Sequence, residues 1–307
     1  SAQSSAYFGV SVAHAGDFNG DGYSDVIVGA SRFTSGQSLE GFAFLYTGSS
    51  SGLSAGAPYW YGEANQASAR LGSSVASAGD VNGDGYSDIL VGAPYYDNPT
   101  LNGGTAYLWY GTPTAPVPGN PDNADWASGR QQEDALYGTS VSSAGDVNGD
   151  GYSDILVGCP NNDGTPGVDA GMVALWYGSA DGPYPVAAGW IAEGSAANGN
   201  FGFCVAGNGD VNGDGYSDIL VGAHDYTNGQ TEEGRSFVYY GNDSRGLSRD
   251  PRQATSTLSH VIAPLGRSNS ETAIGLGIRG RTPAGRGEVR IEWELAPHGT
   301  SFDGVAD

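Results

Sequence analysis

Four short segments of the sequence place acidic and amide side chains at alternate positions, in the pattern D-x-N-G-D-G-Y-S-D. In the first segment Asp17, Asn19, Asp21 and Asp25 occupy positions 1, 3, 5 and 9. Side chains at alternate positions of a tight loop can converge on one point, and oxygen atoms of this kind are the ligands that Ca²⁺ prefers. Glycine at position 6, such as Gly22, permits the sharp turn that such a loop needs. The pattern therefore predicts one calcium site in each segment.

The predicted ligands are the side chains at positions 1, 3, 5 and 9 and the backbone carbonyl oxygen at position 7, which belongs to a tyrosine. Calcium accepts about six to eight oxygen ligands in flexible geometry, whereas Mg²⁺ keeps its waters in a strict octahedron, so calcium is favoured. The alternative is a set of Asn-Gly hairpin turns with incidental acids, but converging carboxylates would repel one another without a cation. The four predicted sites are Asp17, Asn19, Asp21, Tyr23 and Asp25; Asp80, Asn82, Asp84, Tyr86 and Asp88; Asp146, Asn148, Asp150, Tyr152 and Asp154; and Asp210, Asn212, Asp214, Tyr216 and Asp218.

The charge of the chain is consistent with stored cation ligands. The formal net charge is -22, from 34 acidic and 12 basic residues, and each of the four segments holds three of the acids. The sequence has no basic patch that would neutralise phosphates, so nucleic acid is excluded as a partner. No apolar run approaches the ~20 residues that a membrane-spanning helix needs, so no membrane span is expected.

The acidic segments belong to a longer repeat. Their first aspartates, Asp17, Asp80, Asp146 and Asp210, are 63, 66 and 64 residues apart. After each segment come a short apolar run rich in β-branched residues and an element that ends in aromatic residues and glycine. A fourth element with a tryptophan follows in three of the repeats. Four short strands in each repeat are typical of a propeller blade, so the expected fold class is an all-β propeller of four-stranded blades.

The recurrent tryptophans, Trp60, Trp126 and Trp190, keep the spacing of the repeat. Regular spacing favours a role in the core, so these side chains are expected to pack between blades. A set of carbohydrate-binding platforms is the alternative interpretation.

The propeller is expected to occupy residues 1–254, with four blades at about residues 7–62, 70–128, 136–192 and 200–254. The repeat is lost in residues 255–307, where alternating apolar and polar residues predict a C-terminal β-hairpin extension. The chain starts just after the place of an outer strand, and the fourth unit lacks its tryptophan near Ala254. Three ways to close the ring are therefore left open: the C-terminal segment, upstream blades, or a strand from a neighbouring subunit.

Each unit begins with a Phe-Gly-like pair, Phe8-Gly9 in the first, and continues through the acidic loop to a Gly-Ala-Pro-like end, Gly92-Ala93-Pro94 in the second. This pattern resembles the FG-GAP repeat of integrin α-subunit propellers and of many bacterial surface proteins. The resemblance covers roughly residues 7–250 in four copies. It implies a β-propeller with calcium in the first hairpin loop of each blade. Members of the family usually have seven blades, whereas this chain shows four.

The two cysteines depart from their repeats in adjacent units. Cys159 stands where other units have alanine, and Cys204 where they have serine. A disulfide between them is the favoured interpretation and two free buried thiols are the alternative. A disulfide and calcium-loaded loops would both suit an extracellular or cell-surface location. The histidines form no zinc-type cluster and no nucleophile motif such as G-x-S-x-G occurs, so an enzyme is not expected.

The leading hypothesis is a non-catalytic, calcium-stabilised interaction or adhesion module that binds a protein or glycan. Loops on the face opposite the acidic loops would contact this partner. The alternative is a structural subunit of a surface layer or filament that self-assembles by strand addition at its terminal strands. The candidate partner-binding residues are Tyr95, Tyr96, Asp97, Asn162, Asp163, Asp225 and Tyr226.

Overall fold

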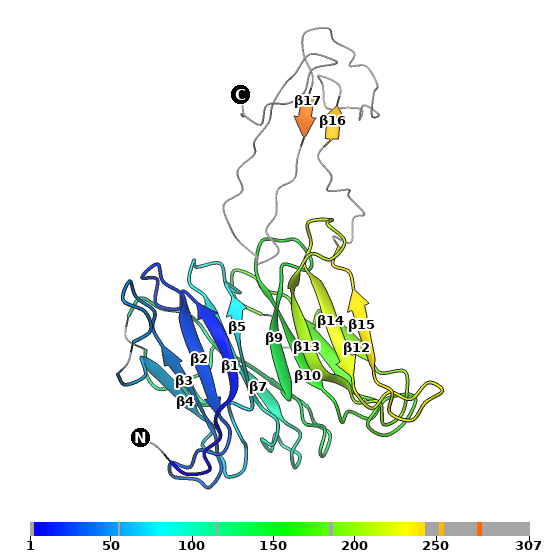
Figure 1. Cartoon of the computed structure of the whole chain (residues 1–307), viewed down its shortest axis with the longest axis horizontal. Helices are drawn as coiled ribbons and strands as arrows, with labels where there is room; N and C mark the ends of the chain where they lie inside the picture. The colour runs from blue at the N-terminus through cyan, green and yellow to red at the C-terminus, as the bar shows by residue number, and fades with distance from the viewer. Residues whose placement is uncertain are drawn as a thin grey trace.

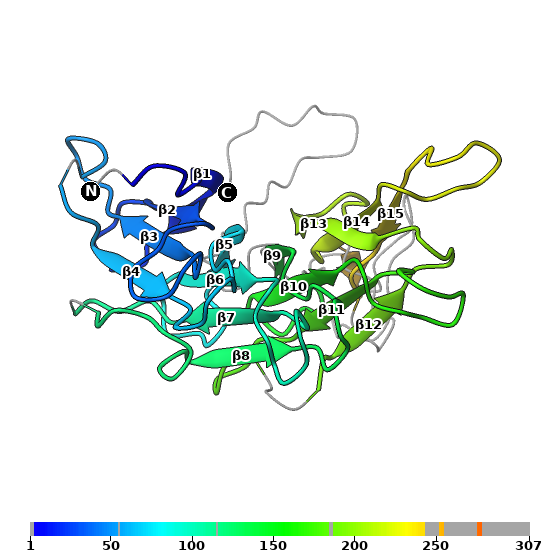
Figure 2. The same ribbon diagram turned by 90° about the horizontal axis from the view of Figure 1, so that it is seen from below.

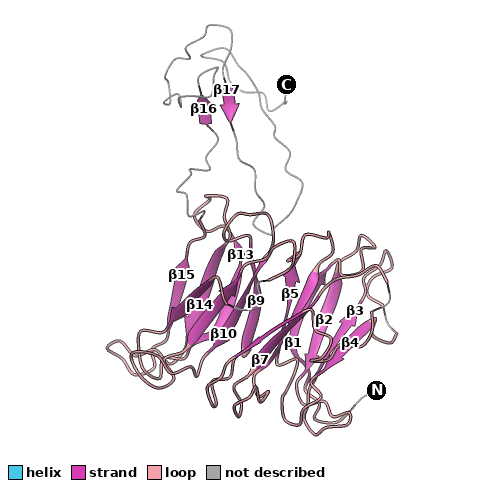
Figure 3. Ribbon diagram, turned by 180° about the vertical axis from the view of Figure 1, so that it is seen from behind, coloured by secondary structure: helices cyan, strands magenta, loops and turns pink. Residues whose placement is uncertain are grey.

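The computed structural model describes residues 3–54, 56–114, 116–183, 187–242, 252–254 and 275–277. All regular structure in these residues is β-strand, as Figures 1 and 3 show from opposite sides. None of the described residues forms a helix that is long and apolar enough to cross a membrane. The expected all-β class is confirmed.

One antiparallel sheet forms around each acidic segment, with its strands in chain order. The first blade is β1 (Phe8–Gly16), β2 (Asp25–Ala30), β3 (Phe42–Tyr46) and β4 (Trp60–Glu63). The second is β5 (Ser74–Gly79), β6 (Asp88–Ala93), β7 (Thr105–Trp109) and β8 (Trp126–Gly129). The third is β9 (Ser140–Gly145), β10 (Asp154–Cys159), β11 (Met172–Trp176) and β12 (Trp190–Glu193). The fourth has three strands among the described residues, β13 (Phe201–Gly209), β14 (Asp218–Ala223) and β15 (Arg235–Tyr239).

The blades are arranged as an arc. Their innermost strands β1, β5, β9 and β13 pack side by side in that order, and Figure 2 shows the outer strands fanning away from them. Within the described residues β13 packs on β9, with no comparable packing on β1. The first and fourth blades therefore form the two ends of an open arc.

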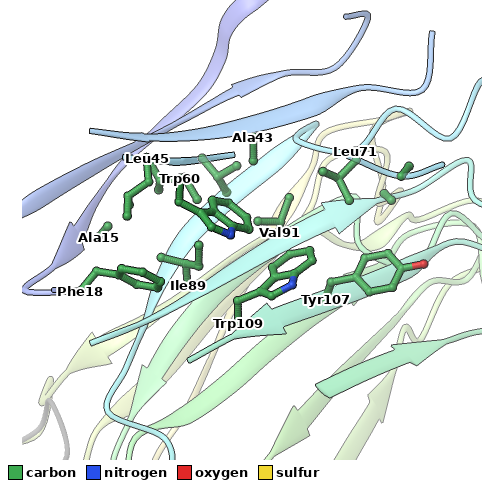
Figure 4. Packing of buried hydrophobic residues seen from close by; sticks show 14 of the residues in the cluster. Ala15, Phe18, Ala43, Leu45, Trp60, Leu71, Ile89, Val91, Tyr107 and Trp109 are labelled. Atoms are coloured by element: carbon green, nitrogen blue, oxygen red, sulfur yellow. The ribbon is translucent and has the colours of Figure 1, made fainter. Parts of the chain in front are cut away.

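Apolar side chains fill the spaces between neighbouring blades. The second strand of each blade is short and rich in β-branched residues, and in β6 and β10 every residue is buried because blades cover both faces. Trp60 of the first blade meets Trp109 of the second, with ring centroids 5.1 Å apart, as Figure 4 shows. Trp126 and Trp176 repeat this contact at 5.1 Å between the next two blades. The prediction that the tryptophans pack between blades is confirmed.

Hydrogen bonds join the same neighbours. The Ser11 hydroxyl oxygen accepts the backbone N–H of Val75 in the next blade at 3.0 Å. The Ser74 and Ser140 hydroxyl oxygens accept from Val141 and Val205 in the same way. A glycine in the second strand of the blade, here called the middle strand, allows the close approach of the two blades. A Cβ on Gly92 would collide with the carbonyl oxygen of Gly138. The repeat thus encodes the blade interface as well as the blade.

The two cysteines are not joined, which corrects the disulfide prediction. Cys159 lies in the core between the second and third blades, where its Sγ donates a hydrogen bond to the Ala135 carbonyl oxygen at 3.2 Å. Cys204 is exposed on β13 of the fourth blade. Because Cys159 faces the second blade, its thiol points away from Cys204.

The C-terminal hairpin prediction falls almost wholly outside the described residues. Within residues 255–307 the structure describes β17 (Gly275–Gly277), which pairs antiparallel with β16 (Arg252–Ala254) at the end of the predicted fourth blade. The boundary at residue 254 stays a prediction.

The interface between blades should dominate stability. Leu90 is fully buried between the second and third blades, so Leu90→Ala should lower the free energy of unfolding by ~2–5 kcal/mol through lost contacts and a cavity. Leu101→Ala is the matched control, because Leu101 lies in the same blade and is 54% exposed. Urea denaturation of both variants measures the difference. Equal losses would contradict the interface assignment.

Candidate functional site

The four acidic segments form the hairpin loops between the first and second strands of the blades. In the first loop the Asp17 carboxylate accepts two backbone N–H bonds, from Asp21 at 3.0 Å and from Gly22 at 2.9 Å. The Asp21 carboxylate accepts the N–H of Tyr23 at 3.0 Å. Gly22 has φ +88°, a conformation that side-chain-bearing residues rarely adopt. The acidic side chains therefore fold the loop around themselves.

Asparagine at position 3 completes this arrangement. Asn19 Oδ1 accepts the N–H of Asp21 at 3.1 Å, and its Nδ2 donates to Asp21 Oδ2 at 2.9 Å. The other loops repeat both the asparagine–aspartate bond and the bond from the position 7 N–H to position 5. These repeats involve Asn82, Asp84 and Tyr86; Asn148, Asp150 and Tyr152; and Asn212, Asp214 and Tyr216.

The aspartate at position 9 has a role that the spacing did not predict. Asp88 begins the middle strand and is fully buried. Its Oδ2 accepts the N–H of Val81 in the loop at 2.8 Å, and its Oδ1 accepts the N–H of Gly111 after the third strand at 2.9 Å. One carboxylate thus joins the loop to both neighbouring strands. Asp25, Asp154 and Asp218 make the equivalent pairs of bonds.

A signal for this second role was present in the sequence. A glycine follows the aromatic end of every third strand, and these four glycines donate the N–H groups that the position 9 aspartates accept: Gly48, Gly111, Gly178 and Gly241. The spacing alone did not show that this glycine lies beside the position 9 aspartate, because the two come together only when the second and third strands pair.

The buried aspartates are held at an electrostatic cost. Burial raises the pKa of Asp88 to about 8, and the nearby Asp84 and Asp80 carboxylates add to the effect, while the two backbone N–H bonds oppose it. Burial likewise raises the pKa of Asp25 and of Asp154. A cation beside such a carboxylate would favour its ionised form and lower the pKa again.

The loops supply only hard oxygen donors, which is the chemistry that Ca²⁺ takes. Over the residues that the structure describes, however, no three His, Cys, Asp or Glu side chains cluster as a metal site. The carboxylates at positions 1 and 5 accept N–H bonds of their own loop instead. Each oxygen that accepts one such bond keeps a further lone pair. The donor set therefore fits calcium chemically, and the ligand assignment stays a prediction.

The loops after the second strands lie at the opposite ends of the blades, because the strands are antiparallel. A cleft of about 400 Å³ opens among them near the inner strands. Two of the predicted partner-binding residues, Tyr95 and Asp225, line it together with Asn161, Phe203 and His224. The sequence prediction missed these last three. Phe203 carried a possible signal, because it is an aromatic residue where the second and third repeats have Ser73 and Thr139.

The cleft brings aromatic and ionisable groups together. His224 Nε2 lies 3.2 Å from Asp225 Oδ2, and the rings of His224 and Phe203 are 4.0 Å apart. On the other side the Arg70 guanidinium stacks over the Tyr95 ring at 4.1 Å. Cation–π and ring contacts hold these side chains in place.

Two other predicted partner-binding residues make contacts inside the blades. Asn162 is fully buried, and its Oδ1 accepts a hydrogen bond from Arg130 Nε at 2.7 Å. Tyr96 packs edge-on against Tyr107 beside the core between the first two blades. Burial rules out a surface role for Asn162, whereas Tyr96 is partly exposed and its role stays a prediction. The other three lie outside the cleft lining: Asp97, Asp163 and Tyr226.

One buried acid on this side lies outside both sites. Glu40 is fully buried, with Oε1 accepting the N–H groups of Ser35 and Gln37. Its Oε2 is buried and has no hydrogen-bond partner among the residues that the structure describes. Burial raises the pKa of this carboxyl, and the nearby Glu63 charge raises it further.

Comparison with known proteins finds the same four repeats. The FG-GAP repeat family matches residues 8–43, 71–109, 137–176 and 205–239, so each match contains one acidic loop. Integrin alpha pat-2 of Caenorhabditis elegans is 34% identical over 224 residues, which are 68% of this chain and 17% of that protein. Integrin alpha-PS2 of Drosophila melanogaster is 32% identical over 71% of this chain and 15% of its own length. Human integrin alpha-6 is 34% identical over 47% of this chain and 12% of its own length. The chain thus spans less than a fifth of these relatives.

The buried Glu40 gives a pH test. The pKa of Glu40 is raised in the folded chain, so the folded state binds the proton more tightly than the unfolded state does. The free energy of unfolding therefore falls as the pH rises above 4.5, the ordinary pKa of this carboxyl. Glu40→Gln should therefore be more stable than the parent at pH 7, with the difference shrinking as the pH falls toward 4. Glu133→Gln, at an exposed site, is the control. Urea midpoints across this pH range measure the effect, and a difference that does not change with pH would contradict it.

Proposed function

Because the chain belongs to the FG-GAP repeat family, we propose that it is a calcium-stabilised adhesion or interaction module of the cell surface or extracellular space. The observation that carries the calcium proposal is the fourfold recurrence of one acidic loop with one hydrogen-bond pattern. Three carboxylates brought together in one loop repel one another, and a cation among them would relieve that repulsion.

Calcium would act by neutralising the loop carboxylates. The chain has a formal net charge of -22, and four Ca²⁺ ions would bring this to -14 (-22 + 8). The proposed ligands are the side chains at positions 1, 3, 5 and 9 with the carbonyl oxygen at position 7. Since the position 9 aspartates join each loop to the middle and third strands, an ion there would stabilise the blade as a whole. The role is structural, and we propose no catalytic one.

The partner would bind at the cleft on the opposite side. Tyr95, Phe203 and His224 supply aromatic surface that is already held in place, and Asp225 supplies charge. Ordered aromatic anchors beside charged groups are typical of protein interaction sites. The likeness to integrin alpha chains supports a protein ligand and a location outside the cell.

Calcium titration tests the first part. Isothermal calorimetry should give four Ca²⁺ per chain, and EDTA should lower the melting temperature, because each site adds ~2.7 kcal/mol at about 100 times its Kd. Asp84→Ala should reduce the stoichiometry to three. Asp122→Ala is the control in the same blade, since Asp122 is exposed and lies outside the loop. Absence of binding heat together with an unchanged melting temperature would contradict the proposal.

A binding assay tests the second part. The labelled chain, loaded with calcium, is applied to arrays of extracellular proteins and glycans. Tyr95→Ala and Asp225→Ala should each weaken the strongest signal by about tenfold, equivalent to ~1.4 kcal/mol. Asp122→Ala should retain it. A signal that both cleft variants keep would place the partner elsewhere.

A further inference from the structure

Each blade has two distinct faces. The face that packs on the preceding blade is here called the front face, and the face that packs on the following blade the back face. In the second blade the front face is fully covered by the first blade. It consists of Leu71, Val75, Ile89, Val91, Tyr107 and Trp109.

The first blade presents the same front face to solvent. Phe8 and Val12 occupy the repeat positions of Leu71 and Val75, and they are 58% and 65% exposed, against 0% and 5%. Phe44 and Tyr46 occupy the positions of Tyr107 and Trp109 and are partly exposed. A front face built for packing is therefore present without the blade that would cover it in the described structure.

This front face is hollowed and aromatic. A groove of about 690 Å³ runs along it, lined by Phe8, Phe33, Phe42, Phe44 and Tyr61. Their rings contact one another, with Phe33 and Phe42 4.7 Å apart and Phe8 and Phe44 5.8 Å apart. Contiguous apolar surface of this kind marks an interaction site on a folded protein.

The other end of the arc exposes the complementary back face. In the first three blades the back-face leucine or isoleucine of the middle strand is fully buried, and in the fourth blade Leu220 at that position is 39% exposed. Val238 and Val211 are likewise 43% and 60% exposed, whereas Leu45 and Phe18 at their positions in the first blade are buried. One chain thus carries both halves of an interface that it forms three times internally.

Hydrogen-bond positions extend the match. At the three internal interfaces a serine on the inner strand accepts the N–H of a valine in the next blade. At the free back face this position is Cys204, which is exposed. At the free front face the valine position is Val12. If a fourth copy of the interface forms, Cys204 and Val12 become neighbours.

We propose that the front face of the first blade docks on the back face of the fourth blade of a second copy of this chain. Two such contacts, made reciprocally, join two arcs of four blades into one closed ring of eight. Figure 2 shows the arc whose two ends would meet their counterparts. A head-to-tail interface that closes after two copies gives a finite dimer. This inference rests on blade packing and is independent of the proposed calcium and ligand roles.

Solution mass and complementation test this pairing. The full chain should have twice its 31.3 kDa mass in light scattering at high micromolar concentration. Phe8→Asp and Leu220→Asp, each at an exposed site, should halve the measured mass while leaving the circular dichroism unchanged. Mixing the two variants should restore dimers, because one of the two interfaces then pairs an intact front face with an intact back face. Leu101→Asp, at an exposed site away from both faces, should stay dimeric.

Cross-linking tests the register. Val12→Cys should form a disulfide-linked dimer with the native Cys204 under mild oxidation, and Val12→Cys in a Cys204→Ser background should not. A monomeric parent chain that also fails to cross-link overturns the proposal. So does a dimer that survives either Asp variant, because a front-to-front pair would keep Leu220→Asp dimeric. Failure of the mixed variants to pair overturns the reciprocal arrangement.

Discussion

Each blade depends on the pair of backbone hydrogen bonds that the buried aspartate at the start of its middle strand accepts. Asp88 accepts one N–H from its loop and one from the residue after the third strand, so a single carboxylate aligns three strands. The same group is costly to bury, and its pKa is raised to about 8 by desolvation and by the other loop acids. A cation held by those acids would relieve the repulsion that they create. The loop and the strand pairing are therefore parts of one electrostatic arrangement.

A row of blades packed in this way exposes one apolar face at each end. Each interface joins a front face rich in aromatic residues to a back face of aliphatic residues and an outer-strand tryptophan. Inner-strand serines accept backbone N–H bonds from the next blade and fix the register. A stack whose units contact only their neighbours is as stable as its interfaces allow, and the terminal faces need a cover. Phe8 and Leu220 lie on the two blade faces that no other described blade covers.

Much of this could be predicted from the sequence because a strict repeat turns one local pattern into four independent observations. The hairpin position of Asp17 and its equivalents, the strand after each loop and the packing of Trp60 and Trp126 all followed from spacing. The predictions that proved wrong depended on the direction in which a side chain points within or between blades. Cys159 faces the second blade, and Asn162 turns inward to Arg130, so neither the disulfide nor the surface role could be judged from position in the repeat alone. The cleft beside Tyr95 also escaped prediction, because its walls come from three blades.

The most direct test of the calcium account is a crystal structure of the full chain grown in calcium, with anomalous scattering used to locate the ions. We expect one ion in each of the four loops, with oxygens of positions 1, 3, 5, 7 and 9 at about 2.3–2.6 Å. Loops without anomalous density, in which Asp17 and its equivalents keep only their backbone N–H bonds in saturating calcium, would contradict it.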